Sequence, residues 1–156
     1  KVRAYHILIN LYLEYGEETS GAKAVDLCLV VLRELGCTFP RTSVGRLCST
    51  MRGLVNVKIF ASKWLKKSAE DYVVSDDAKE EAVAKTLNFL ISAAYFSSKE
   101  YVPLVMLKGL KRAMHRGITC RSPPAFAMQG VVVGYLMGDF QSGRKFAETA
   151  LELLKL

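Results

Sequence analysis

The sequence predicts an all-α protein of about seven helices, and three observations lead to this fold class. Apolar residues recur at intervals of three and four along nearly the whole chain, which is the spacing of one helix face. No stretch alternates polar and apolar residues for long, and no Asn-Gly or Asp-Gly pair marks a β-hairpin. Caps, glycines and prolines divide the pattern into segments with short connections, so we expect antiparallel neighbours.

The first two helices follow from their stop signals. Apolar residues at helical spacing mark a helix over about 7–15, which Gly16 ends. Ser20 is placed to cap the second helix because its hydroxyl can accept a backbone N–H hydrogen bond. Gly36 then ends that helix, since glycine adopts positive φ without strain.

The third helix is the most basic part of the chain. It begins after Pro40, at Thr42 or Ser43, and is predicted to run to about Lys67. Segment 41–67 has seven basic residues and no acidic one, which equals the whole net charge of +7. The predicted buried face of this helix is Val44, Leu47, Met51, Leu54, Ala61 and Leu65. Arg52, Lys63, Lys66 and Lys67 fall in another sector of the helix, which is interpreted as a solvated face or, alternatively, as a binding surface for an acidic partner or a phosphate backbone.

The fourth helix begins with an acidic turn, and the fifth follows it closely. Asp77 is predicted to cap the fourth, with Glu80 three residues later completing a capping box. We interpret the neighbouring acids as helix-start residues rather than a cation site. The fifth runs from about Glu100 to His115, whose side chain can meet the negative helix end, and Gly117 ends it. Three aromatic residues between these helices are expected in the core: Tyr95, Phe96 and Tyr101.

The sixth and seventh helices meet at a pair of glycines. Ser122 is predicted to cap the sixth. Gly138 and Gly143 have the spacing of a phosphate-binding loop, but Arg144 and Lys145 stand where Lys and Ser or Thr are required. The preceding apolar residues also have helical rather than strand spacing, so the glycines are interpreted as a turn and a close helix contact.

This last segment resembles the tetratricopeptide repeat. The residues that carry the resemblance are Gly134-Tyr135, Gly138-Asp139-Phe140 at the turn, and the small residues Gly143, Ala147 and Ala150. Gly143 departs from the alanine that is usual there. A weaker copy near the amino end has Gly16 at the turn, followed by Ala24, Cys28 and Val31. The resemblance implies helical hairpins stacked as a right-handed superhelix.

A wider resemblance covers about residues 10–156. The order of Leu35-Gly36 with Pro40, His115-Arg116-Gly117, Ser122-Pro123 and Gly138-Asp139-Phe140 is similar to a helical region of large signalling proteins. That region lies downstream of the NTPase module in STAND/AAA-type predicted ATPases linked to kinase or cyclase domains. The resemblance implies a scaffold that regulates attached domains, and it carries no catalytic residue onto this chain.

Size and composition bound the remaining choices. With 156 residues, of which 51% are hydrophobic, the chain is predicted to form one folded domain over 1–156. Its longest apolar runs are shorter than the ~18–20 residues that cross a bilayer. It begins without Met inside a helical pattern, so we expect a fragment of a longer chain. The four cysteines lack metal-ligand spacing and are interpreted as buried side chains in a reducing, cytoplasmic compartment.

These observations favour a non-catalytic helical scaffold that mediates protein–protein interaction or regulates attached signalling domains. No catalytic, metal-binding or cofactor-binding residues are predicted. One alternative is a structural subunit that docks on an acidic partner through the basic helix over 41–67. Another is nucleic-acid binding by a helical repeat, but the regular units with paired polar positions that code-like RNA recognition needs are not evident.

Overall fold

The structure is a computed structural model that describes residues 2–14, 18–64 and 71–155. This described part is helical and confirms the all-α prediction with seven α-helices. They are α1 (Val2–Glu14), α2 (Glu18–Glu34), α3 (Ser43–Trp64), α4 (Ala78–Ser97), α5 (Val102–Arg116), α6 (Pro123–Val131) and α7 (Phe140–Leu153). A 3-10 turn, η2 (Lys99–Tyr101), precedes α5, and a π-helical turn, η3 (Val132–Leu136), continues α6. The β-pairing among these residues is one isolated parallel bridge between Val74 and Ile118.

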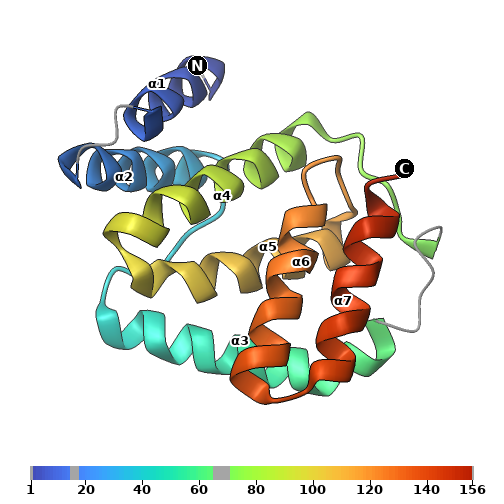
Figure 1. The fold of residues 1–156 in the computed structure, drawn as a ribbon. Coiled ribbons are helices and arrows are strands. Elements are labelled where there is room, and N and C mark those ends of the chain that lie inside the picture. The colour runs from blue at the N-terminus through green and yellow to red at the C-terminus, as the bar shows by residue number, and fades with distance from the viewer. Residues whose placement is uncertain (1, 15–17, 65–70, 156) are drawn as a thin grey trace.

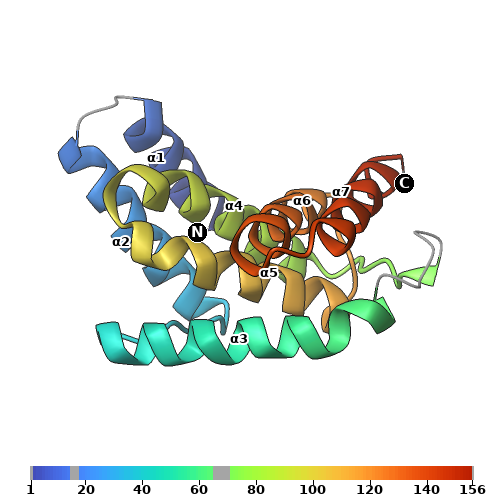
Figure 2. The same cartoon turned by 60° about the horizontal axis from the view of Figure 1, so that its bottom comes forward.

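The helices pack as hairpins, with α3 set apart from them. Helices α1 and α2, α4 and α5, and α6 and α7 are paired, and α2 makes extensive contacts with α4 rather than with α3 (Figure 1). The long helix α3 packs against α5 and runs along one edge of the molecule (Figure 2). Helix α3 therefore interrupts the series of antiparallel hairpins, and the series continues with α4 and α5.

The buried side chains form two clusters that α5 joins. Ile9, Leu32 and Leu90 represent the cluster of α1, α2 and α4, to which α5 contributes Val105. The second cluster contains residues of α3, α5, α6 and α7, among them Val57, Leu110, Phe126 and Phe146. Because α5 supplies side chains to both clusters, it ties the two halves of the described structure together.

Local signals predicted several helix ends correctly. The Thr42 hydroxyl accepts the N–H of the third residue of α3 at 3.1 Å. Asp77 accepts the N–H two residues along at 2.8 Å, and Asp139 accepts the N–H three residues along at 3.0 Å. Of the predicted stop glycines, Gly36, Gly117 and Gly138 have positive φ, and Gly16 lies outside the described residues. These ends depend on contacts within one turn, which is why the sequence reveals them.

The side chains of three predicted capping residues have other roles. Helix α2 begins at Glu18, so Ser20 lies inside its first turn and is buried. Ser122 is the N-cap residue of α6, as predicted, but its hydroxyl makes no cap hydrogen bond and instead accepts the Thr119 N–H at 2.9 Å. Glu80 does not complete a capping box either, because its carboxylate pairs with Arg112 of α5.

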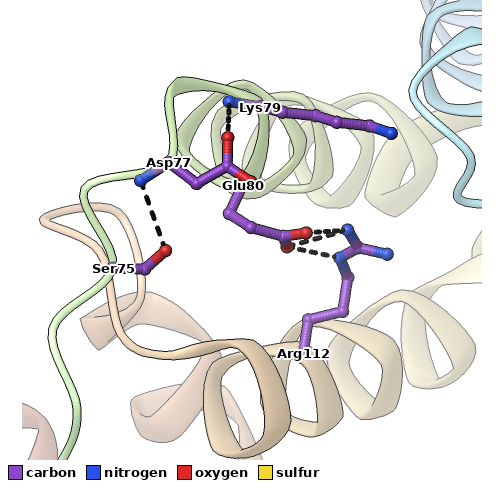
Figure 3. Close-up of polar contacts among 5 residues, drawn as sticks. All are labelled: Ser75, Asp77, Lys79, Glu80 and Arg112. Carbon is purple, nitrogen blue, oxygen red and sulfur yellow. Dashed lines mark hydrogen bonds and ion pairs between the residues drawn. The ribbon is translucent and has the colours of Figure 1, made fainter.

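The Glu80–Arg112 ion pair fastens α4 to α5 (Figure 3). Arg112 Nη2 donates to both carboxylate oxygens at 2.7 Å, and Nε donates to Oε2 at 3.0 Å. The Glu80 side chain is only 9% exposed and that of Arg112 is 23% exposed. A charge-assisted pair of this geometry, largely withdrawn from water, holds the two helices in one relative position.

The small residues near the carboxyl end allow α6 and α7 to touch through their backbones. A Cβ added at Gly130 would lie 2.7 Å from the Gly143 carbonyl oxygen, and one at Gly143 would lie 2.8 Å from that of Gly130. Ala150 is buried as predicted, whereas the Ala147 side chain is exposed. The segment before Gly138 is helical, as the apolar spacing predicted. Close helix packing therefore accounts for Gly130 and Gly143.

His6, interpreted from the sequence as an ordinary helix residue, is buried between α1 and α4. Its Nε2 lies 2.8 Å from the Thr86 hydroxyl, which itself donates to the Ala82 carbonyl at 2.7 Å. A hydroxyl has a single proton to donate, so Nε2 must be the donor to Thr86. Burial, with a smaller contribution from the Lys85 charge, lowers the pKa of His6 below 6.5.

We expect this lowered pKa to make the protein less stable in mild acid. Because the unfolded chain binds the proton more readily, the full stability is present above pH 6.5 and is lost as pH falls from there through the folded-state pKa. Melting temperatures at pH 7.5 and pH 5 should show this loss, and His6→Gln should reduce it. His115→Gln, which removes the other, exposed histidine, is the matched control; an equal loss in all three proteins would contradict the assignment to His6.

The cysteines divide into two classes. Cys28 and Cys37 are buried as expected, and burial raises the pKa of Cys28 to about 12. Cys48 and Cys120 are exposed, contrary to the expectation that all four are core residues. Cys28 lies on the inward face of α2, and Cys37 follows the end of that helix. Cys48 lies on α3, and Cys120 lies in the connection before α6.

Candidate protein-interaction surface

Helix α3 has an inner side that α5 covers. A Cβ added at Gly53 would lie 2.7 Å from Leu107 Cδ1 of α5, and Val57 is buried in the second cluster. At the amino end of α3, the Arg46 guanidinium lies 4.7 Å from the Tyr101 ring centroid and 3.6 Å from the Glu100 carboxylate. These contacts determine which side of α3 faces the other helices. They are made by small and polar residues as well as by valine.

The opposite side of α3 displays a row of large apolar side chains, each between 53% and 72% exposed. This outer row consists of Val44, Leu47, Met51, Val55 and Ile59. Its members follow at intervals of three and four residues, so they lie along one side of the helix. The structure describes no helix on this side of α3 (Figure 2).

The outer row corrects the predicted buried face of α3. Val44, Leu47 and Met51 are exposed, while Leu54 is partly buried against the second cluster. The side chains of Ala61 and Leu65 lie outside the described residues. The prediction was wrong because α3 has apolar residues on more than one side, and helical spacing does not reveal which side a neighbour covers.

The charges beside the outer row are positive. Arg52 and Lys58 are exposed, and segment 41–67 contains no acidic residue. Arg52 therefore shares the solvent side with the outer row, although the sequence placed them on opposite faces. The Lys63 side chain, Lys66 and Lys67 lie outside the described residues, so their place relative to Arg52 stays a prediction.

A second exposed apolar surface lies between α4, α5 and α6. Tyr95 and Tyr135 line a shallow groove there together with Val102, Met106 and Val131. Two of the aromatic residues expected in the core, Tyr95 and Phe96, are exposed. They directly follow Ala94, which is on the buried face of α4, and successive residues of a helix point about 100° apart, so they turn away from the core.

The space beside the Glu80–Arg112 pair is too small for a substrate. The partly open space beside it measures about 20 Å³, which accommodates one water molecule. Small-molecule sites usually occupy roughly 300–1,000 Å³. In the described ranges, no three His, Cys, Asp or Glu side chains gather as a metal site would require.

None of the helices that the structure describes combines the length and apolarity needed to cross a membrane. The chain has no significant match among protein-family models, curated protein sequences or solved structures.

Proposed function

We propose that this chain is a non-catalytic, tetratricopeptide-like helical scaffold that binds a protein partner or regulates attached signalling domains. Three features support the proposal: the paired helices, the backbone contact between α6 and α7, and the tetratricopeptide-like residues at their turn. Stacked hairpins of this kind expose extended surfaces, which such proteins use to bind partners.

The observation that carries the proposal is the outer row of α3. Single exposed apolar side chains are common on protein surfaces, but a contiguous row marks an interaction site. Here five large apolar residues are exposed on one side of one helix, and the inner side of that helix is already packed on α5. A row with this geometry can be buried by a protein partner without any change in the fold.

The proposal predicts that partner binding depends on the outer row. An affinity-tagged chain should retain a protein from native extract, and Leu47→Asp with Val55→Asp should abolish that retention because the charges prevent burial of the row. Ile7→Asp with Val30→Asp, at exposed apolar positions of α1 and α2, is the matched control and should keep the partner. Circular dichroism should confirm that all variants are folded.

The same experiment tests the second candidate, a structural subunit that docks through the basic helix. The specific observation favouring it is the acid-free segment 41–67 with Arg52 exposed. Charge reversal at Lys63, Lys66 and Lys67 should then abolish co-purification while the row remains intact. Retention of an identical set of proteins by every variant would contradict both candidates.

A further inference from the structure

We propose that the outer row of α3 binds an amphipathic helix with acidic residues beside its apolar side. This inference rests on the proposed function and specifies the partner. It follows from three properties of the described surface: the shape of the row, the sign of the charges next to it, and the way α3 is held.

The shape of the row fits a helix. From Val44 to Ile59 the row covers 15 residue steps, or about 22 Å of helix, which is roughly four turns. The row is a single line of side chains on a convex helix surface, and its members are aliphatic or thioether residues. A second helix can place its own apolar side chains between such a line of residues, as helices do when they pack side by side.

The charges beside the row specify the partner. Arg52 lies between Met51 and Val55 along α3, and Lys58 precedes Ile59; both cations are exposed. No acid within 41–67 neutralises them from the same helix. Glutamate or aspartate at the flanking positions of the partner helix would meet these cations. Pairs of this kind at the rim of an interface contribute modestly to affinity and strongly to the choice of partner.

The same charges disfavour a second copy of this chain. In a two-fold dimer the same surface is used by both copies, so Arg52 and Lys58 of each copy would enter an interface to which segment 41–67 of the other brings further cations and no acid. Charge repulsion between like residues would oppose that contact. An acidic helix has no such conflict.

The row also differs from a membrane-binding face. Membrane-surface helices carry aromatic and large aliphatic residues over a broad apolar face, with lysine and arginine on the polar face. The described outer row contains no aromatic residue, and the side of α3 opposite to it is packed on α5. The narrow row with flanking cations is suited to a protein helix.

Contacts at its amino end and on its inner side keep α3 in place, so the outer row is formed before a partner binds. Arg46 is anchored by the Tyr101 hydroxyl at 3.2 Å, the Arg41 carbonyl at 2.9 Å and the Ser43 hydroxyl at 3.1 Å. Gly53 and Val57 seat the middle of the helix on α5. A partner therefore meets a helix that is already formed, so α3 adds no cost of backbone ordering to binding.

The inference is tested with designed peptides and the whole chain. The probe is a 22-residue peptide with leucine at heptad positions a and d and glutamate at e and g, whose repulsion limits self-pairing. A matched peptide carries lysine in place of glutamate. Fluorescence anisotropy should show binding of the acidic peptide and weaker binding of the basic one.

Protein variants separate the two parts of the surface. Leu47→Asp with Val55→Asp should lower the affinity for the acidic peptide at least tenfold. Arg52→Glu with Lys58→Glu should weaken the acidic peptide about tenfold and strengthen the basic one, because two rim ion pairs change sign. Ile7→Asp with Val30→Asp should change neither affinity. If the double aspartate variant fails to fold, Leu47→Ser with Val55→Ser replaces it.

Other outcomes would overturn the inference. Equal binding of both peptides, unaffected by the charge reversal, would reject the acidic partner. Binding to vesicles of phosphatidylcholine and phosphatidylserine that depends on the row, without peptide binding, would assign the surface to a membrane. Concentration-dependent self-association abolished by the row variant would assign it to a second copy. If the extract partner depends on the row but no acidic helix binds, the proposed function stands and this inference fails.

Discussion

Glu80→Ala is expected to lower the free energy of unfolding by about 3 kcal/mol. The substitution removes the carboxylate that accepts three hydrogen bonds from Arg112 and leaves that guanidinium without its partner. Removing one member of a buried ion pair is more damaging than the net value of the pair, because the remaining charge stays desolvated. The 23% exposure of Arg112 admits some water, which places the effect at the low end of the range for buried pairs. Urea unfolding followed by circular dichroism measures it.

Glu81→Ala provides a matched control for the Glu80 prediction. Glu81 also lies in the first turn of α4, but its side chain is exposed. Its loss should change stability by less than about 1 kcal/mol, the usual value of one charge near a helix end. The double variant Glu80→Leu with Arg112→Met should recover most of the stability, because it removes both desolvated charges. Equal losses for Glu80→Ala and Glu81→Ala would show that the ion pair is not a stabilising contact.

Gly130→Ala is expected to lower the free energy of unfolding by about 2 kcal/mol. The new methyl group would lie 2.7 Å from the Gly143 carbonyl oxygen, and a backbone atom inside a helix cannot move aside as a flexible side chain can. Overpacking of this kind costs about 3 kcal/mol, and the better helix propensity of alanine returns about 1 kcal/mol. Thermal and urea unfolding of the variant measure the difference.

Gly134→Ala is the corresponding control. It adds the same methyl group one turn further along, but its nearest neighbour would be the Phe140 ring at 3.8 Å, an ordinary contact. Its stability should equal that of the parent protein or exceed it by up to about 1 kcal/mol. A Gly130→Ala protein as stable as the parent would show that α6 and α7 do not approach through these glycines.

The candidate surface shows what the spacing of residues can and cannot predict. The basic segment was evident from the sequence, and Arg52 is exposed as expected. The apolar row beside it was assigned to the core, because the sequence does not say that α5 packs on the side of Gly53 and Val57. Binding surfaces and core faces are both apolar, so only the position of a neighbouring helix distinguishes them.

Residue patterns along the chain were enough to predict the all-α fold class, the order of the helices and several of their ends. Caps such as Asp77 and stop residues such as Gly138 act through hydrogen bonds and dihedral angles within one turn, so nearby residues are sufficient to predict them. Three features could be seen only in the folded protein: α2 packs on α4, Glu80 pairs with Arg112, and the outer row of α3 faces solvent. Each of these features depends on contacts between residues that are far apart in the sequence. Helical periodicity does not predict such long-range contacts.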